Sequence, residues 1–93
     1  SKPPFPKTAQ PTLELLKMLL RINASDADVA PRLIASADDL ERLAADDAPD
    51  VPALAGWRHD LFGADALDLK AGKIALSLKD GQIEKLKIQG SSA

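Results

Sequence analysis

The chain has one histidine, His59, and no cysteine, so few side chains are available for nucleophilic or metal chemistry. His59 stands between Arg58 and Asp60 in an expected helix, where a surface position is the simplest interpretation. No serine lies in a nucleophile-elbow pattern, and the sequence contains no glycine-rich phosphate loop. We therefore predict no catalytic residue in this chain.

Carboxylates are the other candidates for chemistry, because two-metal nucleases hold cations about 4 Å apart between converging acids. Asp39-Leu40-Glu41 has the Asp-x-Glu spacing of one such motif, but it falls in an expected helix, which splays the two acids apart. Asp26 and Asp28 resemble the start of a calcium loop whose glycine and closing glutamate are missing. Helix capping and solubility explain these acids more simply, and we predict no metal site and no cofactor in this chain.

Trp57-Arg58 is a pair whose types suit nucleic-acid binding, because an indole can stack on a base and a guanidinium can pair with a phosphate. The only tryptophan of a small domain is also a natural core anchor, and we favour that interpretation of Trp57, with Arg58 reaching solvent. Together with this pair, the candidate nucleic-acid-binding residues are the bases Lys17, Arg21, Arg32, Lys70 and Lys73.

The net charge of −2 departs from the basic excess that nucleic-acid-binding modules usually show. Residues 26–50 contain eight acids against Arg32 and Arg42, whereas residues 1–24 contain four bases against Glu14. The distribution predicts an acidic, solvated surface between two mildly basic ends. Any contact with nucleic acid must therefore come from a local patch.

Length and composition predict a single small domain with an aliphatic core. The 93 residues are 45% hydrophobic but only 3% aromatic, and no apolar run approaches the roughly 20 residues that a membrane helix needs. The N-terminus lacks the apolar stretch of a signal peptide. We expect a monomer that is cytoplasmic and does not associate with membranes.

The elements that must position these residues are mainly helices. The chain divides into a proline-rich linker arm over residues 1–11, a helical domain over residues 12–88 and a flexible tail over residues 89–93. Leucines at helical spacing predict a first helix from Thr12 to about Ala24, which can extend towards Asp28.

Three further helices are expected after a short connector over residues 31–35. Ser36 is expected to cap a helix over residues 37–45, with Asp39 closing a capping box. Asp50 is expected to cap a helix that runs to about Phe62 and stops at Gly63, before a short helix over residues 64–69. The side chains expected to face the core in these segments are Leu33, Ile34, Leu40, Leu43, Ala44, Leu54, Trp57, Leu61 and Phe62.

The last part of the chain changes to a period of two. Ile74, Leu76 and Leu78 alternate with polar or small residues, and Asp80-Gly81 is a strong hairpin signal before a return strand over residues 82–88. A bulge near residues 84–85 would place the apolar residues of the return strand on one face. We thus predict a mostly α fold of about four helices with a C-terminal β-hairpin.

Two stretches of sequence carry a resemblance to a known family. Residues 29–36, Val-Ala-Pro-Arg-Leu-Ile-Ala-Ser, and residues 38–44, Asp-Asp-Leu-Glu-Arg-Leu-Ala, resemble the HRDC domain shared by RecQ helicases and ribonuclease D. Residues 52–63, Pro-Ala-Leu-Ala-Gly-Trp-Arg-His-Asp-Leu-Phe-Gly, followed by residues 65–76, resemble the extreme C-terminus of ribonuclease D from alphaproteobacteria. The likeness covers about residues 13–88.

The resemblance implies an HRDC-like accessory domain without catalytic residues. It also implies a parent protein that is a metal-dependent 3′–5′ exoribonuclease acting in tRNA 3′-end processing. Divalent metal ions would then belong to an upstream exonuclease domain, which would be the intramolecular partner, and tRNA or another structured RNA would be the ligand. The alternative, favoured by the acidic surface, is a protein–protein or intramolecular scaffold that does not touch RNA.

Overall fold

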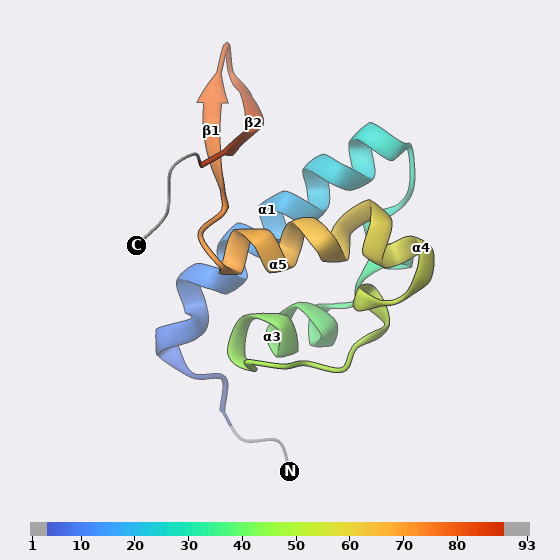
Figure 1. The fold of residues 1–93 in the computed structure, drawn as a ribbon, viewed down its shortest axis with the longest axis vertical. Coiled ribbons are helices and arrows are strands. Elements are labelled where there is room, and N and C mark those ends of the chain that lie inside the picture. The colour runs from blue at the N-terminus through green and yellow to red at the C-terminus, as the bar shows by residue number, and fades with distance from the viewer. Residues whose placement is uncertain (1–3, 89–93) are drawn as a thin grey trace.

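Helices and a C-terminal β-hairpin form the part of the chain that the computed structural model describes, residues 4–88 (Figure 1). The predicted mostly α fold with a C-terminal hairpin is confirmed. The elements are η1 (Lys7–Ala9), α1 (Gln10–Ala27), α2 (Pro31–Ile34), α3 (Ala37–Ala45), η2 (Pro52–Leu54), α4 (Gly56–Arg58), η3 (His59–Gly63), α5 (Ala64–Lys70), β1 (Ile74–Lys79) and β2 (Gln82–Lys87). The tail predicted over residues 89–93 lies outside the described residues.

Helix α1 is the central element of the core. Its residues Leu16 and Leu19 are completely buried, which follows from the wide apolar stripe of the sequence. The helix begins at Gln10 rather than Thr12, because Pro11 occupies the first turn, where its missing N–H costs nothing. The 3-10 turn η1 precedes it and buries Ala9, so helical structure already begins within residues 1–11, the segment that we predicted to be a proline-rich linker arm.

Helix α3 has the boundaries and the cap that its sequence predicts. The Ser36 hydroxyl accepts a hydrogen bond from the Asp39 N–H at 3.0 Å, and the Asp39 carboxylate accepts one from the Ser36 N–H at 3.2 Å. Such a cap stabilises a helix by about 1 kcal/mol. Asp39 therefore has a structural role at the start of α3.

We predicted a helix from Asp50 to about Phe62, and both predicted ends are wrong. Its first turn is the separate 3-10 turn η2, and the backbone is extended at Ala55 before the helix resumes at Gly56. From Gly56 the chain stays helical through α4, η3 and α5 to Lys70, and we call this run the composite helix. Its middle part, η3, is a π-helical turn in which the Ala64 N–H donates to the His59 carbonyl, five residues back.

Gly63 does not stop the helix, because it continues with helical dihedral angles. Its absent side chain serves packing instead. A Cβ atom at this position would collide with the carbonyl oxygen of Ala53 and lie 3.1 Å from Cδ2 of Leu54. Only glycine therefore lets η2 pack directly against η3.

The hairpin forms at Asp80-Gly81 as predicted, with β1 and β2 antiparallel and in unbroken register from the Ile74–Lys87 pair to the Lys79–Gln82 pair. The expected bulge is wrong, because Glu84 and Lys85 each pair with a single residue of β1. Without a bulge, Leu86 pairs with Ala75 on the face opposite Ile74, and it is exposed.

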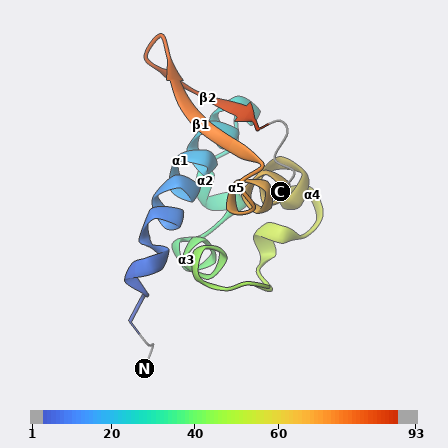
Figure 2. The same cartoon turned by 60° about the vertical axis from the view of Figure 1, so that its left-hand side comes forward.

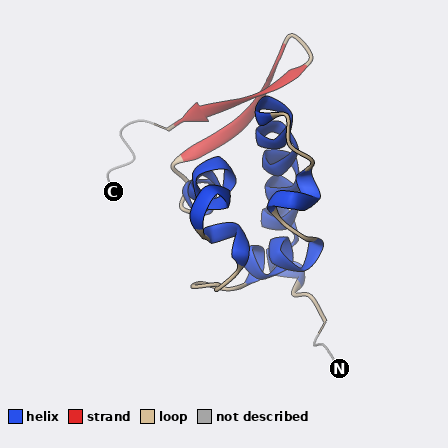
Figure 3. Ribbon diagram, turned by 90° about the vertical axis from the view of Figure 1, so that its right-hand side faces the viewer, coloured by secondary structure: helices blue, strands red, loops and turns tan. Residues whose placement is uncertain are grey.

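The helices surround one aliphatic core, and the hairpin extends from one side of them (Figures 2 and 3). Phe62 is the only aromatic side chain among the fully buried residues of the described chain. Ile74 is the one residue of the hairpin in the buried core cluster. No helix within residues 4–88 combines the length and the apolar character needed to cross a membrane.

We predict that Gly63→Ala lowers the free energy of unfolding by about 1–3 kcal/mol, because the added methyl group overpacks the contact with η2. Gly56→Ala is the matched control. Nothing lies within 4 Å of that position, and only its left-handed backbone, with φ +59°, opposes the substitution, at about 1 kcal/mol. Urea titrations of both variants provide the measurement, and an equal or smaller loss for Gly63→Ala would contradict the packing role.

Candidate nucleic-acid interface

The carboxylates and the histidine considered for catalysis do not converge. Within residues 4–88, no group of three or more histidine or acidic side chains is arranged to hold a metal ion. His59 is partly exposed, and its ring lies 3.5 Å from the carboxylate of the neighbouring Asp60. Asp39 is engaged in the cap of α3.

Trp57 and Arg58 form a stacked pair on the surface, so the interpretation of Trp57 as a core anchor is wrong. The Trp57 side chain is 48% exposed, and the Arg58 guanidinium carbon lies 4.4 Å from the centre of its ring. Spacing along the helix is the physical reason. Trp57 lies five and nine residues before Phe62 and Ala66, the fully buried side chains of the composite helix, and neither spacing is the three or four residues that place side chains on one face.

Helix α2 holds Trp57 and Arg58 in place through one of its backbone carbonyls. Arg58 Nε donates a hydrogen bond to the Leu33 carbonyl at 2.9 Å, which fixes the guanidinium over the indole. Ile34 is buried as predicted, whereas Leu33 is 54% exposed and does not fill the core. The exposed Arg32 precedes it on α2. We call the set Arg32, Leu33, Trp57 and Arg58 the tryptophan patch.

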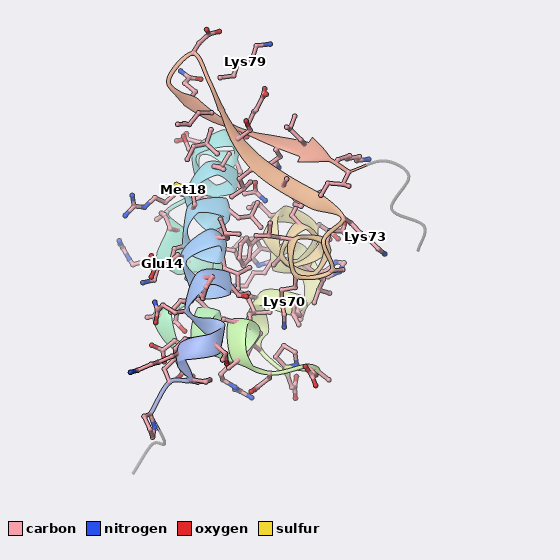
Figure 4. The ribbon with its side chains drawn as sticks, turned by 90° about the vertical axis from the view of Figure 1, so that its left-hand side faces the viewer. Glu14, Met18, Lys70, Lys73 and Lys79 are labelled. Carbon is pink, nitrogen blue, oxygen red and sulfur yellow. The ribbon has the colours of Figure 1, made fainter. Side chains whose placement is uncertain are left out.

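The other predicted bases do not join the tryptophan patch through any bond in the described chain. Lys70 is at the far end of the composite helix from Arg58, about 18 Å away along its axis. Its amine donates to the Asp46 carbonyl at 2.7 Å, and Figure 4 shows Lys70 and Lys73 on the side away from Glu14 and Met18. Lys17 and Arg21 are exposed on α1, and Lys17 lies 3.5 Å from the Glu14 carboxylate.

A polar network that the sequence interpretation missed links α1, the composite helix and β2. Asn23, 5% exposed, donates from Nδ2 to the Leu61 carbonyl and to the Asp65 carboxylate, both at 3.0 Å. The Lys85 amine donates to Asn23 Oδ1 and to Asp65 at 2.9 Å. The signal was present in the sequence, because Asn23 is a polar residue at a core position of the stripe of α1. We call these residues the Asn23 network.

Asp65 has a pKa below its ordinary value of 3.8. Partial burial acts to raise the pKa, but the hydrogen bonds from Asn23 and Lys85, with the positive charges of Lys85 and Lys87, outweigh it. The carboxylate is therefore ionised at neutral pH and holds β2 against α1 and α5.

An apolar groove separates α1 from the hairpin, with a volume of about 530 Å³. Leu15 on α1 is 47% exposed and Leu78 on β1 is 72% exposed, so the groove has apolar walls that water reaches. Its lining residues are Glu14, Leu15, Met18, Leu76, Ser77, Leu78 and Ile83.

The known proteins that this chain resembles all carry the same name. No protein-family model matches this chain, and no solved structure matches it. A protein named ribonuclease D from Nitrobacter hamburgensis is 53% identical over 75 residues, which cover 81% of this chain and 20% of the relative.

Two further relatives, both named ribonuclease D, extend the match. The Acidiphilium cryptum protein is 51% identical over 85 residues, covering 88% of this chain and 22% of the relative. The Sphingobium indicum protein is 41% identical over 88 residues, covering 95% of this chain and 23% of the relative. The chain spans about a fifth of the length of the curated relatives it matches.

We predict that the Asn23 network makes stability depend on pH in the acidic range. Because the pKa of Asp65 is lowered on folding, its contribution is complete above the unfolded pKa near 3.8 and is lost as the pH falls through the folded pKa. Thermal unfolding between pH 6 and pH 2.5 measures this contribution. Asp65→Asn should flatten the decrease in melting temperature, whereas the control Asp47→Asn, at an exposed side chain, should leave it unchanged.

Proposed function

This chain is homologous to one segment of alphaproteobacterial proteins named ribonuclease D, and from that premise we propose that it is a non-catalytic accessory domain of a ribonuclease D-type 3′–5′ exoribonuclease. The observation that carries the proposal is the extent of the match, which takes in 81–95% of this chain in these three relatives. The remaining four fifths of such a protein would contain the carboxylates and the divalent metal ions of catalysis.

We propose an HRDC-like domain, at the C-terminal end of its parent, that binds RNA and helps present tRNA 3′ ends to the exonuclease. The tryptophan patch supports a role in RNA binding, because it combines an exposed indole with two arginines. Lys17, Arg21, Lys70 and Lys73 would make peripheral phosphate contacts at most, since they are on other parts of the surface and two of them are already bonded. The domain itself would need no cofactor.

The apolar groove favours a second candidate function. An intramolecular scaffold would bury Leu15 and Leu78 against another part of the parent protein and would shape its active site without touching RNA. The net charge of −2 is compatible with this role, because protein docking needs no basic excess.

We predict salt-dependent RNA binding through the tryptophan patch. Titration of this chain with unmodified tRNA at 20–200 mM salt should give a linear log–log plot, and Arg32→Ala should reduce its slope by about 0.7–0.9, the loss of one phosphate contact. Lys79→Ala is the matched control, because it removes the same charge at the hairpin tip (Figure 4) and should not change the slope. Failure to bind tRNA at 20 mM salt would contradict the proposal.

An NMR titration with tRNA separates the two candidate functions. RNA binding predicts amide shifts confined to α2 and α4, around Leu33 and Trp57. The scaffold predicts unchanged spectra at every tRNA concentration, because its contact surface, the groove beside Leu78, would not meet RNA.

A further inference from the structure

Trp57 is exposed at a position where the fold does not need it. The core is filled by aliphatic side chains and Phe62, and Trp57 makes no hydrogen bond to any residue within 4–88. Its side chain forms a cation–π stack with Arg58. A large aromatic side chain that is held in one orientation but is half open to solvent has the properties of a binding residue.

Arg58 is positioned by two interactions, and neither uses its terminal nitrogens. The guanidinium stacks on the indole at 4.4 Å, and Nε donates to the Leu33 carbonyl at 2.9 Å. The terminal N–H groups have no acceptor within the described residues, so they remain available as a planar donor pair beside the ring.

We infer that Trp57 and Arg58 form a platform for one unpaired RNA base and its phosphate, an inference that rests on the proposed RNA-binding function. The base stacks on the part of the indole that Arg58 leaves open, and the phosphate accepts hydrogen bonds from the terminal nitrogens of Arg58. A paired base within a helix cannot use this platform, because both of its faces are already stacked on neighbouring bases. The ligand is therefore single-stranded RNA rather than a duplex.

The charges around the platform define the side on which the phosphate lies. Arg32, on α2 next to the Leu33 carbonyl that anchors Arg58, adds a second positive charge. Asp60 is one helical turn beyond Trp57 and its side chain is 87% exposed, so it repels a phosphate from that side of the indole. The backbone of the strand should consequently follow α2 and avoid the surface around Asp60.

Trp57 provides its own optical signal, because the chain contains one tryptophan and no tyrosine. We would titrate the chain at 20 mM salt with a labelled ten-residue oligoadenylate and, separately, with a blunt RNA duplex of equal charge. Label anisotropy measures binding, and Trp57 emission measures stacking. Only the oligoadenylate should quench the emission as it binds.

The variants separate stacking from charge. Trp57→Ala should weaken oligoadenylate binding by about 5- to 100-fold with an unchanged salt slope, whereas Trp57→Phe should retain most of the affinity. Arg58→Ala should reduce the salt slope by about 0.7. Leu78→Ala, at a side chain 72% exposed on the hairpin, is the control and should bind like the unaltered chain. Circular dichroism verifies that each variant is folded.

The outcomes distinguish the platform from the proposed function. If oligoadenylate binds without quenching Trp57, or if Trp57→Ala binds it equally well, the platform is wrong and the RNA-binding function stands. Equal binding and equal quenching by the duplex would overturn the preference for unpaired bases. If neither RNA nor tRNA binds at 20 mM salt, both the platform and the proposed function fail, and the scaffold is favoured.

Discussion

The position of the hairpin depends on one buried amide. A two-stranded hairpin is only marginally stable alone, and its apolar contact with the helices is small: Ile74 belongs to the buried core cluster and Leu76 packs against it. Asn23 supplies the remaining constraint, because its amide bonds α5, the π-helical turn and β2 at the same time. These bonds fasten β2 to the helices, and the apolar groove lies between α1 and the same hairpin.

The sequence correctly predicted those elements that are determined by residues close together in the chain. The bounds of α3 follow from the capping residues Ser36 and Asp39, and the hairpin turn follows from Asp80-Gly81. The failed predictions concern contacts between distant residues. Gly63 looked like a helix stop, yet it is required by the approach of Ala53, ten residues earlier. We expected a bulge because it would place Leu86 on the same face as the other apolar residues of the return strand. In the structure β2 pairs with β1 without interruption, and Leu86 is exposed.

The candidate site could be predicted in its residue types but not in its arrangement. Sequence identified the bases and Trp57-Arg58 as suitable for RNA, and it had no means of showing that Lys70 is bonded to Asp46 at the other end of the composite helix. Trp57 was expected in the core on its spacing to Leu61, but the fully buried side chains of the composite helix are Phe62 and Ala66, and Trp57 is not on their side. Spacing rules show which residues share a face of a helix, but they do not show which face the rest of the fold buries.

A net acidic domain can bind RNA if stacking supplies much of the affinity. Stacking on an indole does not depend on net charge, so the acids of residues 26–50 would weaken RNA binding without abolishing it. Attachment to a larger protein would reduce the affinity that is required, because a tethered site acts at an effective concentration of about millimolar. A platform made of one tryptophan and one arginine would then suffice to hold a strand near an exonuclease, and its weakness would let the strand advance after each cleavage.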